Sequence, residues 1–144
     1  MTLRAHYDAD NIFAKIIRGD MPAIKVYEDS DALAFLDIFP QSRGHTLVVP
    51  KQHGATNFLD ADPAMLSRLI GKVQHVAKGV VEALSPDGMR LMQFNGAPAG
   101  QTVFHLHFHI IPIFEGEALG RHGGGKADMG ELEMLAAAIR KALG

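Results

Sequence analysis

The segment QTVFHLHFHIIP, residues 101–112, places three histidines at alternate positions, His105, His107 and His109. The residues between and after them are apolar, and strict alternation of this kind predicts a half-buried β-strand whose side chains point to opposite faces. One face of the strand would carry apolar side chains. The other would carry a row of imidazoles, with about 6.5–7 Å between successive Cα atoms of the row.

Three helices are predicted from apolar positions that recur three and four residues apart. The first is short, lies within DADNIFAKIIRGDMP, begins at Asp8 or Asp10 as its N-cap and ends at Gly19. The second is long, from about residue 63 to residue 84, and the third closes the chain from about residue 129 to residue 143. For the long helix, Asp62 is the expected N-cap and Pro63 the first helical residue.

Five strands are predicted, in IKVYED, ALAFLDI, GHTLVVP, MRLMQFN and VFHLHFHIIP, with a hairpin turn at residues 28–31 between the first two. Strands in consecutive runs with one crossing helix indicate an α+β fold, an antiparallel sheet of about five strands with two main helices on one side. No segment has the composition of a linker, so we expect one domain over residues 1–144, ending in a loop and helix over 115–144.

Composition narrows the possible functions. The chain of 144 residues contains no cysteine, which excludes disulfides, thiolate nucleophiles and cysteine–zinc sites. A formal net charge of -2 argues against a nucleic-acid-coating surface, but it leaves room for a small phosphate-bearing ligand. The N-terminus has no leader-like apolar region and no apolar run is long enough to span a membrane, so we expect a cytoplasmic protein without a membrane partner.

Three interpretations of the histidine row follow from the residues alone. The histidines can be ordinary surface residues, ligands of a metal such as zinc, or groups for phosphoryl chemistry, in which one imidazole attacks phosphorus and its neighbours donate to the phosphoryl oxygens. The loop NGAPAGQT before the row favours the third, because Asn95, Gln101 and Thr102 are neutral donors and Gly96 and Gly100 allow close backbone approach to a ligand.

The chain also resembles a known family. HLHFHII resembles the H-x-H-x-H-x-x motif of the histidine-triad (HIT) family of nucleotide hydrolases and transferases. IFAKIIRGDMPAIKVYEDSDALAFLDIFPQSRGHTLVVPKQH is similar to the N-terminal half of that family, and NGAPAGQTVFHLHFHIIP to its C-terminal half. The resemblance covers about residues 10–114, and the extension past Pro112 is most similar to bacterial members.

The resemblance implies covalent catalysis by His107, which would attack the α-phosphorus of a nucleotide derivative and form a nucleotidyl-imidazole that water hydrolyses. It implies that the backbone carbonyl of His105 holds the second ring nitrogen of His107. His109 would contact the α-phosphate oxygens, and His45 would support the row. On the residues alone, His45 is equally well a histidine at the start of a strand.

The resemblance also implies a nucleotide pocket. Asp37 would accept hydrogen bonds from the ribose hydroxyls, although it can also be read as a turn cap before Pro40. Gln101 and Thr102 would donate to the α-phosphate, and relatives often have serine in place of this threonine. The remaining expected contacts are Asn95, Gly100 and the apolar residues Ile12, Phe13, Ile16, Phe35 and Ile38, which the residues alone would assign to the core.

The sequence departs from the family at the metal site of some bacterial members. Those members hold a structural zinc ion with a C-x-x-C pair in the first helix, and the matching positions here are Asn11 and Ala14. We therefore expect no metal and no cofactor, with His53 as a hydrogen-bonding neighbour of the triad. The segment GRHGGGK is either a solvated loop or a cover that selects the leaving group through Arg121 or Lys126.

These expectations combine into one functional hypothesis, a homodimeric hydrolase or transferase of purine nucleoside phosphoramidates or related nucleotidyl compounds. The apolar stripe of the long helix and the MRLMQFN strand would form the dimer interface. The alternatives are a non-catalytic purine-nucleotide-binding regulatory protein, a dinucleoside polyphosphate hydrolase, and a metalloenzyme that uses the triad as ligands.

Overall fold

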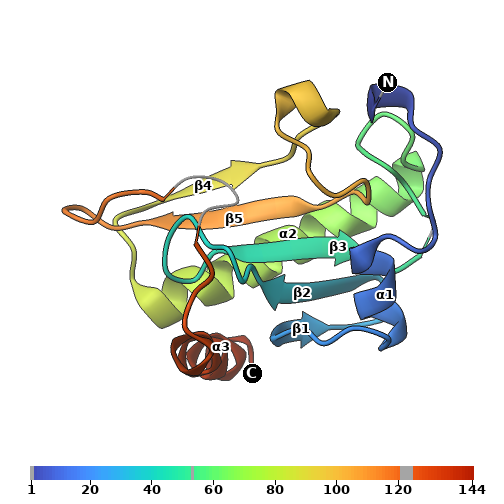
Figure 1. Cartoon of the computed structure of the whole chain (residues 1–144). Helices are drawn as coiled ribbons and strands as arrows, with labels where there is room; N and C mark the ends of the chain where they lie inside the picture. Colours follow the sequence, from blue (N-terminus) through green and yellow to red (C-terminus); the bar gives the residue numbers. More distant parts are fainter. Residues whose placement is uncertain (1, 53, 121–124) are drawn as a thin grey trace.

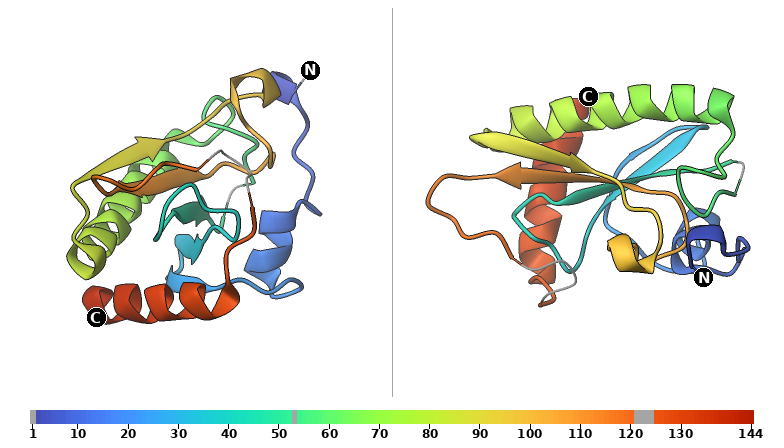
Figure 2. Two further views of the ribbon diagram at one scale, coloured as in Figure 1. Left: turned by 60° about the vertical axis from the view of Figure 1, so that its left-hand side comes forward. Right: turned by 90° about the horizontal axis from the view of Figure 1, so that it is seen from above.

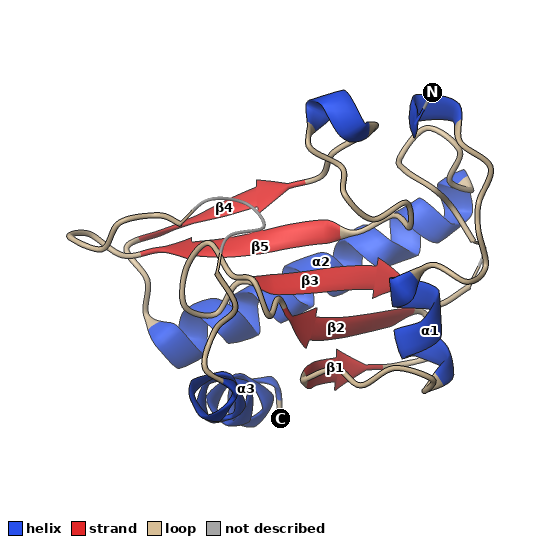
Figure 3. Ribbon diagram, viewed as in Figure 1, coloured by secondary structure: helices blue, strands red, loops and turns tan. Residues whose placement is uncertain are grey.

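A computed structural model of the protein describes residues 2–52, 54–120 and 125–144. Figures 1 and 3 show an antiparallel five-stranded sheet with strand order β1-β2-β3-β5-β4, which confirms the α+β prediction. The strands are β1 (Lys25–Glu28), β2 (Ala32–Leu36), β3 (Thr46–Pro50), β4 (Gly88–Met92) and β5 (Phe108–Ile113). The α-helices are α1 (Ile12–Arg18), α2 (Pro63–Leu84) and α3 (Met129–Leu143), and the 3-10 turns are η1 (Thr2–Arg4) and η2 (Ala97–Ala99).

Helices cover both faces of the sheet. On one face, α2 and α3 pack against alternate residues of β2 and form the main core with Ala32, Ala34 and Leu36. On the other face, α1 places Phe13 and Ile16 against Leu33, Phe35, Leu47 and Val49. Figure 2 shows this arrangement from two further directions. The expectation that the helices lie on one side is therefore correct for α2 and α3 and wrong for α1.

Local signals account for the helix ends. The side chain of Asp62 accepts the backbone N–H of Met65 and caps α2, as predicted. Gly19 ends α1 with φ of 85°, also as predicted. The N-cap of α1 is Asn11 rather than Asp8 or Asp10, because Asn11 Oδ1 accepts the N–H of Ala14 at 2.9 Å. The Asp8 carboxylate instead accepts the N–H of Asp10 in the preceding turn.

The histidine segment differs from the predicted strand. β5 begins only at Phe108, so His105 and His107 lie in irregular backbone before it and His109 alone belongs to the strand. The row is also not on a wet face, because the three side chains are only 2, 6 and 1% exposed. The reason is that α1 covers this face of the sheet and Phe13 contacts the rings of both His105 and His107.

Across the described ranges, the helices are all too short or too polar to cross a lipid bilayer.

Candidate active site

A cavity of about 420 Å³ lies between α1 and the face of the sheet that α1 covers. Its polar lining residues are His107, His109, Asp37 and Thr102, so they are few in a largely apolar space. The apolar lining contains every residue expected for the base pocket: Ile12, Phe13, Ile16, Phe35 and Ile38. Phe13, Ile16 and Phe35 also belong to the second core, so the core and pocket interpretations hold together for these three, whereas Ile38 packs against the main core and Ile12 is 46% exposed.

His107 is held in one tautomer. Its Nδ1 lies 2.7 Å from the backbone carbonyl oxygen of His105, which can only accept a hydrogen bond. Nδ1 therefore carries a proton, and the lone pair of the neutral form of the ring is on Nε2. The ring is 6% exposed, and Phe13 stands edge-on to it with centroids 5.0 Å apart. This geometry holds the imidazole in one orientation at the wall of the cavity.

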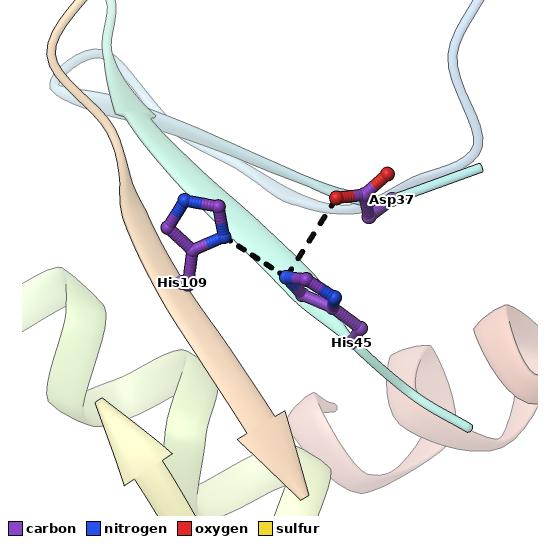
Figure 4. Close-up of side chains that lie close together, drawn as sticks. All are labelled: Asp37, His45 and His109. Carbon is purple, nitrogen blue, oxygen red and sulfur yellow. Dashed lines mark hydrogen bonds and ion pairs between the residues drawn. The ribbon is translucent and has the colours of Figure 1, made fainter. Parts of the chain in front are cut away.

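A second set of hydrogen bonds orients His109. The N–H of Gln41 donates to His45 Nδ1 at 3.0 Å, so neutral His45 carries its proton on Nε2. His45 Nε2 lies 2.9 Å from His109 Nδ1, to which it donates, and 3.7 Å from Asp37 Oδ2 (Figure 4). His109 then carries its own proton on Nε2, as a donor suited to a phosphoryl oxygen.

Asp37, His45 and His109 also have the spacing of a metal site, since one ligand atom of each lies within 4.8 Å of the others. The hydrogen bond from Gln41 argues against this use. It places the proton of His45 on Nε2, the atom that would have to bind the ion, whereas metal-binding histidines donate their second N–H to an acceptor. The cluster is therefore better suited to a hydrogen bond from His45 to His109 than to binding a metal ion.

Asp37 caps the turn before Pro40. Its Oδ1 accepts the N–H of Phe39 at 2.8 Å, which is the turn-cap interaction. The residue also lines the cavity beside His109. The turn therefore holds the carboxylate of a residue in the cavity wall.

Two residues expected to contact the nucleotide instead hold loops together. Both amide protons of Gln101 are used by backbone carbonyls, of Thr56 at 2.6 Å and Val103 at 3.0 Å, and its oxygen accepts the N–H of Gly96. Asn95 accepts the N–H of Phe58 and pairs with Gln93. Neither lines the cavity, so their place is behind the wall that carries Thr102.

Gly100 also shapes this loop, with φ of 110° that a side chain would strain. Near the other end of the chain, the backbone N–H groups of Gly120 and Ala127 donate to the carbonyls of Gln41 and Ile38. The described parts of the C-terminal segment thus hold the loop that carries Asp37, whereas Lys126 is exposed. His53, Arg121 and His122 lie outside the described residues.

The sequence analysis did not predict several of the residues that line the cavity. Met21, Pro22, Ala23, Leu36, Phe39, Leu47 and Val103 complete the cavity wall. Their apolar character indicates only burial, although Met21 and Phe39 are 41% exposed and Ile12 of the same cavity is 46% exposed. Gln41 was also missed, because its contribution is a backbone N–H.

Burial lowers the pKa of His105 from 6.5 to about 4, although the hydrogen bond to the carbonyl of Pro50 opposes the shift. Between these values the unfolded chain binds a proton that the folded chain does not, so stability should fall as the pH drops from 6.5 towards 4. We expect His105 to account for a loss of about 2 kcal/mol in the free energy of unfolding between pH 7 and pH 5.

Urea denaturation at the two pH values measures this loss. His105→Gln should reduce the pH dependence, and His6→Gln, at an exposed position, should leave it as it is. An equal pH dependence in wild type and His105→Gln would contradict the assignment.

Comparisons with known proteins agree with this geometry. The HIT domain family matches residues 18–116. The chain is 44% identical over 101 residues to adenosine 5'-monophosphoramidase hnt1 of Schizosaccharomyces pombe, covering 70% of this chain and 72% of that protein. It is 40% identical over 119 residues to adenylylsulfatase HINT3 of Arabidopsis thaliana, covering 78% of this chain but only 60% of that protein's length.

A solved structure shows the same architecture. The Hit-like protein of Bartonella henselae involved in cell-cycle regulation superimposes with a TM-score of 0.89 at 50% sequence identity, covering 96% of this chain and 99% of that one. With this likeness, the family match and the buried histidine triad beside the cavity, the chain belongs to the HIT domain family.

Proposed function

We propose that the protein hydrolyses nucleoside 5'-phosphoramidates or related nucleotidyl compounds through a covalent nucleotidyl-His107 intermediate. The observation that carries this proposal is the tautomer of His107. Its Nδ1–H is held by the His105 carbonyl at 2.7 Å, which leaves Nε2 as a nucleophile at the cavity wall. The sequence relationship to a phosphoramidase and an adenylylsulfatase of the same family supports this substrate class.

In the first step, His107 Nε2 attacks the α-phosphorus and the bond from phosphorus to the leaving nitrogen breaks; this nitrogen takes a proton from solvent and leaves as the amine. The Nε2–H of His109 donates to a phosphoryl oxygen as negative charge builds up there. In the second step, water attacks the phosphorus, the bond to His107 breaks, and the protons of the water pass to solvent. The nucleoside monophosphate leaves, and the lone pair returns to His107 Nε2.

The rest of the cavity would bind the nucleoside. Asp37 would accept the ribose hydroxyls with the carboxylate that the turn holds in place. The base would lie between the apolar side chains of α1 and β2, such as Ile12, Phe13 and Phe35. An apolar wall distinguishes bases by shape rather than by hydrogen bonds, so a preference for purines should be modest.

Rapid acid quench with adenosine 5'-phosphoramidate followed by intact-mass spectrometry tests the proposal. We expect an adduct of one adenylate on the wild-type chain, with the label on His107 in the peptide map. Tight binding of AMP without an adduct or amine release would show a nucleotide-binding protein instead. Release of a nucleotide from diadenosine polyphosphates but no amine from the phosphoramidate would favour a dinucleoside polyphosphate hydrolase.

We also propose that two copies pair through β4 and α2. β4 is an edge strand bonded only to β5, with Met89 and Leu91 38% and 47% exposed on one of its faces. Beside it, Val81 of α2 is 40% exposed at the edge of a hollow of about 360 Å³. Exposed apolar groups on a free sheet edge favour association with a second sheet edge.

Sedimentation measures this association. The wild type should sediment at twice the monomer mass of 15.6 kDa. Leu91→Glu should sediment as a folded monomer, because a carboxylate would be buried at the interface. A monomeric wild type would rule out this interface.

A further inference from the structure

The N-terminal segment before α1 reaches the first histidine of the triad, His105, through Tyr7, and neither residue lines the cavity. Tyr7 Oη lies 2.9 Å from His105 Nδ1, and the two rings are 5.5 Å apart. This segment precedes the part of the chain that matches the HIT domain, residues 18–116. The contact therefore needs an explanation from this chain's own residues.

The hydrogen bonds of His105 define the direction of this contact. Its Nε2 lies 3.2 Å from the carbonyl oxygen of Pro50, which only accepts, so Nε2 carries the proton. Nδ1 then has the lone pair and accepts the hydroxyl proton of Tyr7. The ring is held from both ends, while the carbonyl of the same residue accepts the Nδ1–H of His107.

Asn11 cannot replace the tyrosine. Its amide nitrogen is 3.4 Å from His105 Nδ1, which is a long contact, and it also donates to the carbonyl of Asp8 at 2.8 Å. Its oxygen caps α1 through the N–H of Ala14. Moving the side chain closer to His105 would break these two bonds, so Tyr7 is the stronger donor to the ring.

The segment that carries Tyr7 is fixed to a loop behind the triad. The side chains of Thr56 and Asn57, both 1% exposed, donate to the carbonyls of Ala5 and Leu3. The ring of Tyr7 packs so closely on Gly54 that a methyl group there would lie 2.5 Å from it. Figure 1 shows this N-terminal segment, in blue, running beside the green loop.

The same loop holds the histidine segment, because the carbonyl of Ala55 accepts the N–H of Leu106 at 2.8 Å. The loop therefore connects the N-terminal segment to the backbone between His105 and His107. Tyr7 adds a second contact to the histidine segment, from its hydroxyl to the ring of His105.

We propose that Tyr7 is a positioning residue for nucleotidyl transfer: with the carbonyl of Pro50 on Nε2, its hydroxyl on Nδ1 holds the ring of His105 in place, so that the backbone carbonyl of His105 presents His107 to the phosphorus. This inference rests on the proposed function. Tyr7 itself stands behind the triad and contacts no substrate. Its loss should slow the chemical step and leave nucleotide binding, which uses the cavity, unchanged.

Tyr7→Phe tests the hydroxyl alone, because the ring that packs on Gly54 is kept. We expect kcat for adenosine 5'-phosphoramidate to fall about 5–10-fold, the value of one hydrogen bond, with KM unchanged. The matched control is Tyr27→Phe, which removes the hydroxyl of the other tyrosine in the sequence. That hydroxyl donates to Asp29 at 2.6 Å, and Tyr27 does not line the cavity. The control should keep the wild-type kcat.

Gly54→Ala gives a second, independent variant, because its methyl group would displace the ring of Tyr7. It should lower kcat by a similar factor, and the double variant should be little slower than either single one. A wild-type kcat in Tyr7→Phe, or additive losses in the double variant, would overturn the proposal. If the two tyrosine variants lose the same amount of melting temperature but only Tyr7→Phe loses kcat, the loss comes from the position of His107. It then does not come from a general loss of stability.

Nitrogen-15 NMR of the His105 ring provides a readout that does not need turnover. In the wild type, Nδ1 should appear as an unprotonated nitrogen that accepts a hydrogen bond, and in Tyr7→Phe its resonance should shift because that bond is lost. If the wild type releases no amine, the proposed function fails. The ring spectra still decide this inference, because an unchanged Nδ1 resonance in Tyr7→Phe would contradict it.

Discussion

His107→Ala is expected to lower kcat for adenosine 5'-phosphoramidate by at least about 10³-fold, because it removes the nucleophile that splits the reaction into two easier steps. The lone pair on Nε2, which the bond to the His105 carbonyl leaves available, has no substitute in an alanine side chain. Release of AMP from excess substrate measures the loss. The nucleotidyl adduct should disappear in the same variant.

The variant should still bind AMP, because the apolar lining of the cavity is intact. The matched control is His75→Ala, since His75 is exposed on α2, does not line the cavity, and packs its ring against Tyr27. It should turn over substrate at the wild-type rate. Activity of His107→Ala within about tenfold of the wild type would mean that another group attacks the phosphorus.

The helices that cover the main core were predictable because their ends depend on local interactions. An aspartate before proline marks the start of α2, and Asp62 does accept the N–H of Met65 there. α3 likewise begins after a capping aspartate, Asp128, and occupies the predicted residues Met129–Leu143. In both helices the apolar stripe has one partner surface, so periodicity alone locates it.

The histidine segment was predicted less well because its surroundings come from distant parts of the chain. Alternation gave the correct face for the imidazoles but not the start of β5 at Phe108 or the burial of the face. Burial depends on α1, which packs against β2 and β3 on that side. A sequence pattern of period two distinguishes the two faces of a strand, but it does not show whether the polar face is covered.

The candidate site also combines features that the sequence predicts with features that depend on distant parts of the chain. Where the resemblance to the HIT family assigns a role through a side chain, the structure places some of these side chains at the cavity, as for Asp37 and Thr102, and others away from it, as for Gln101 and Asn95. The resemblance also assigns one backbone contribution, the carbonyl of His105 beside His107. For other backbone groups and for distant segments, no sequence signal was available. The N–H of Gln41 and the hydroxyl of Tyr7 are examples, because each depends on a chain path that only the fold defines.

Leu106→Ala is expected to reduce the free energy of unfolding by about 2–5 kcal/mol and to lower the melting temperature by roughly 10 °C. Leu106 is 0% exposed and belongs to the main core with α2 and α3, on the opposite side of the backbone from the cavity. Truncation would leave a cavity beneath the short segment between His105 and His107. Thermal unfolding by circular dichroism at one fixed protein concentration measures the loss.

Leu59→Ala is the matched control, because Leu59 is 66% exposed and its truncation should change stability by less than about 0.5 kcal/mol. At a temperature where Leu106→Ala remains folded, its kcat should also be lower than that of the control. The physical reason is that the Leu106 side chain holds the backbone whose carbonyl, at His105, orients His107. A large loss of stability with an unchanged kcat in the folded variant would show that the bonds of His105 to Pro50 and Tyr7 suffice to position the nucleophile without the core beneath it.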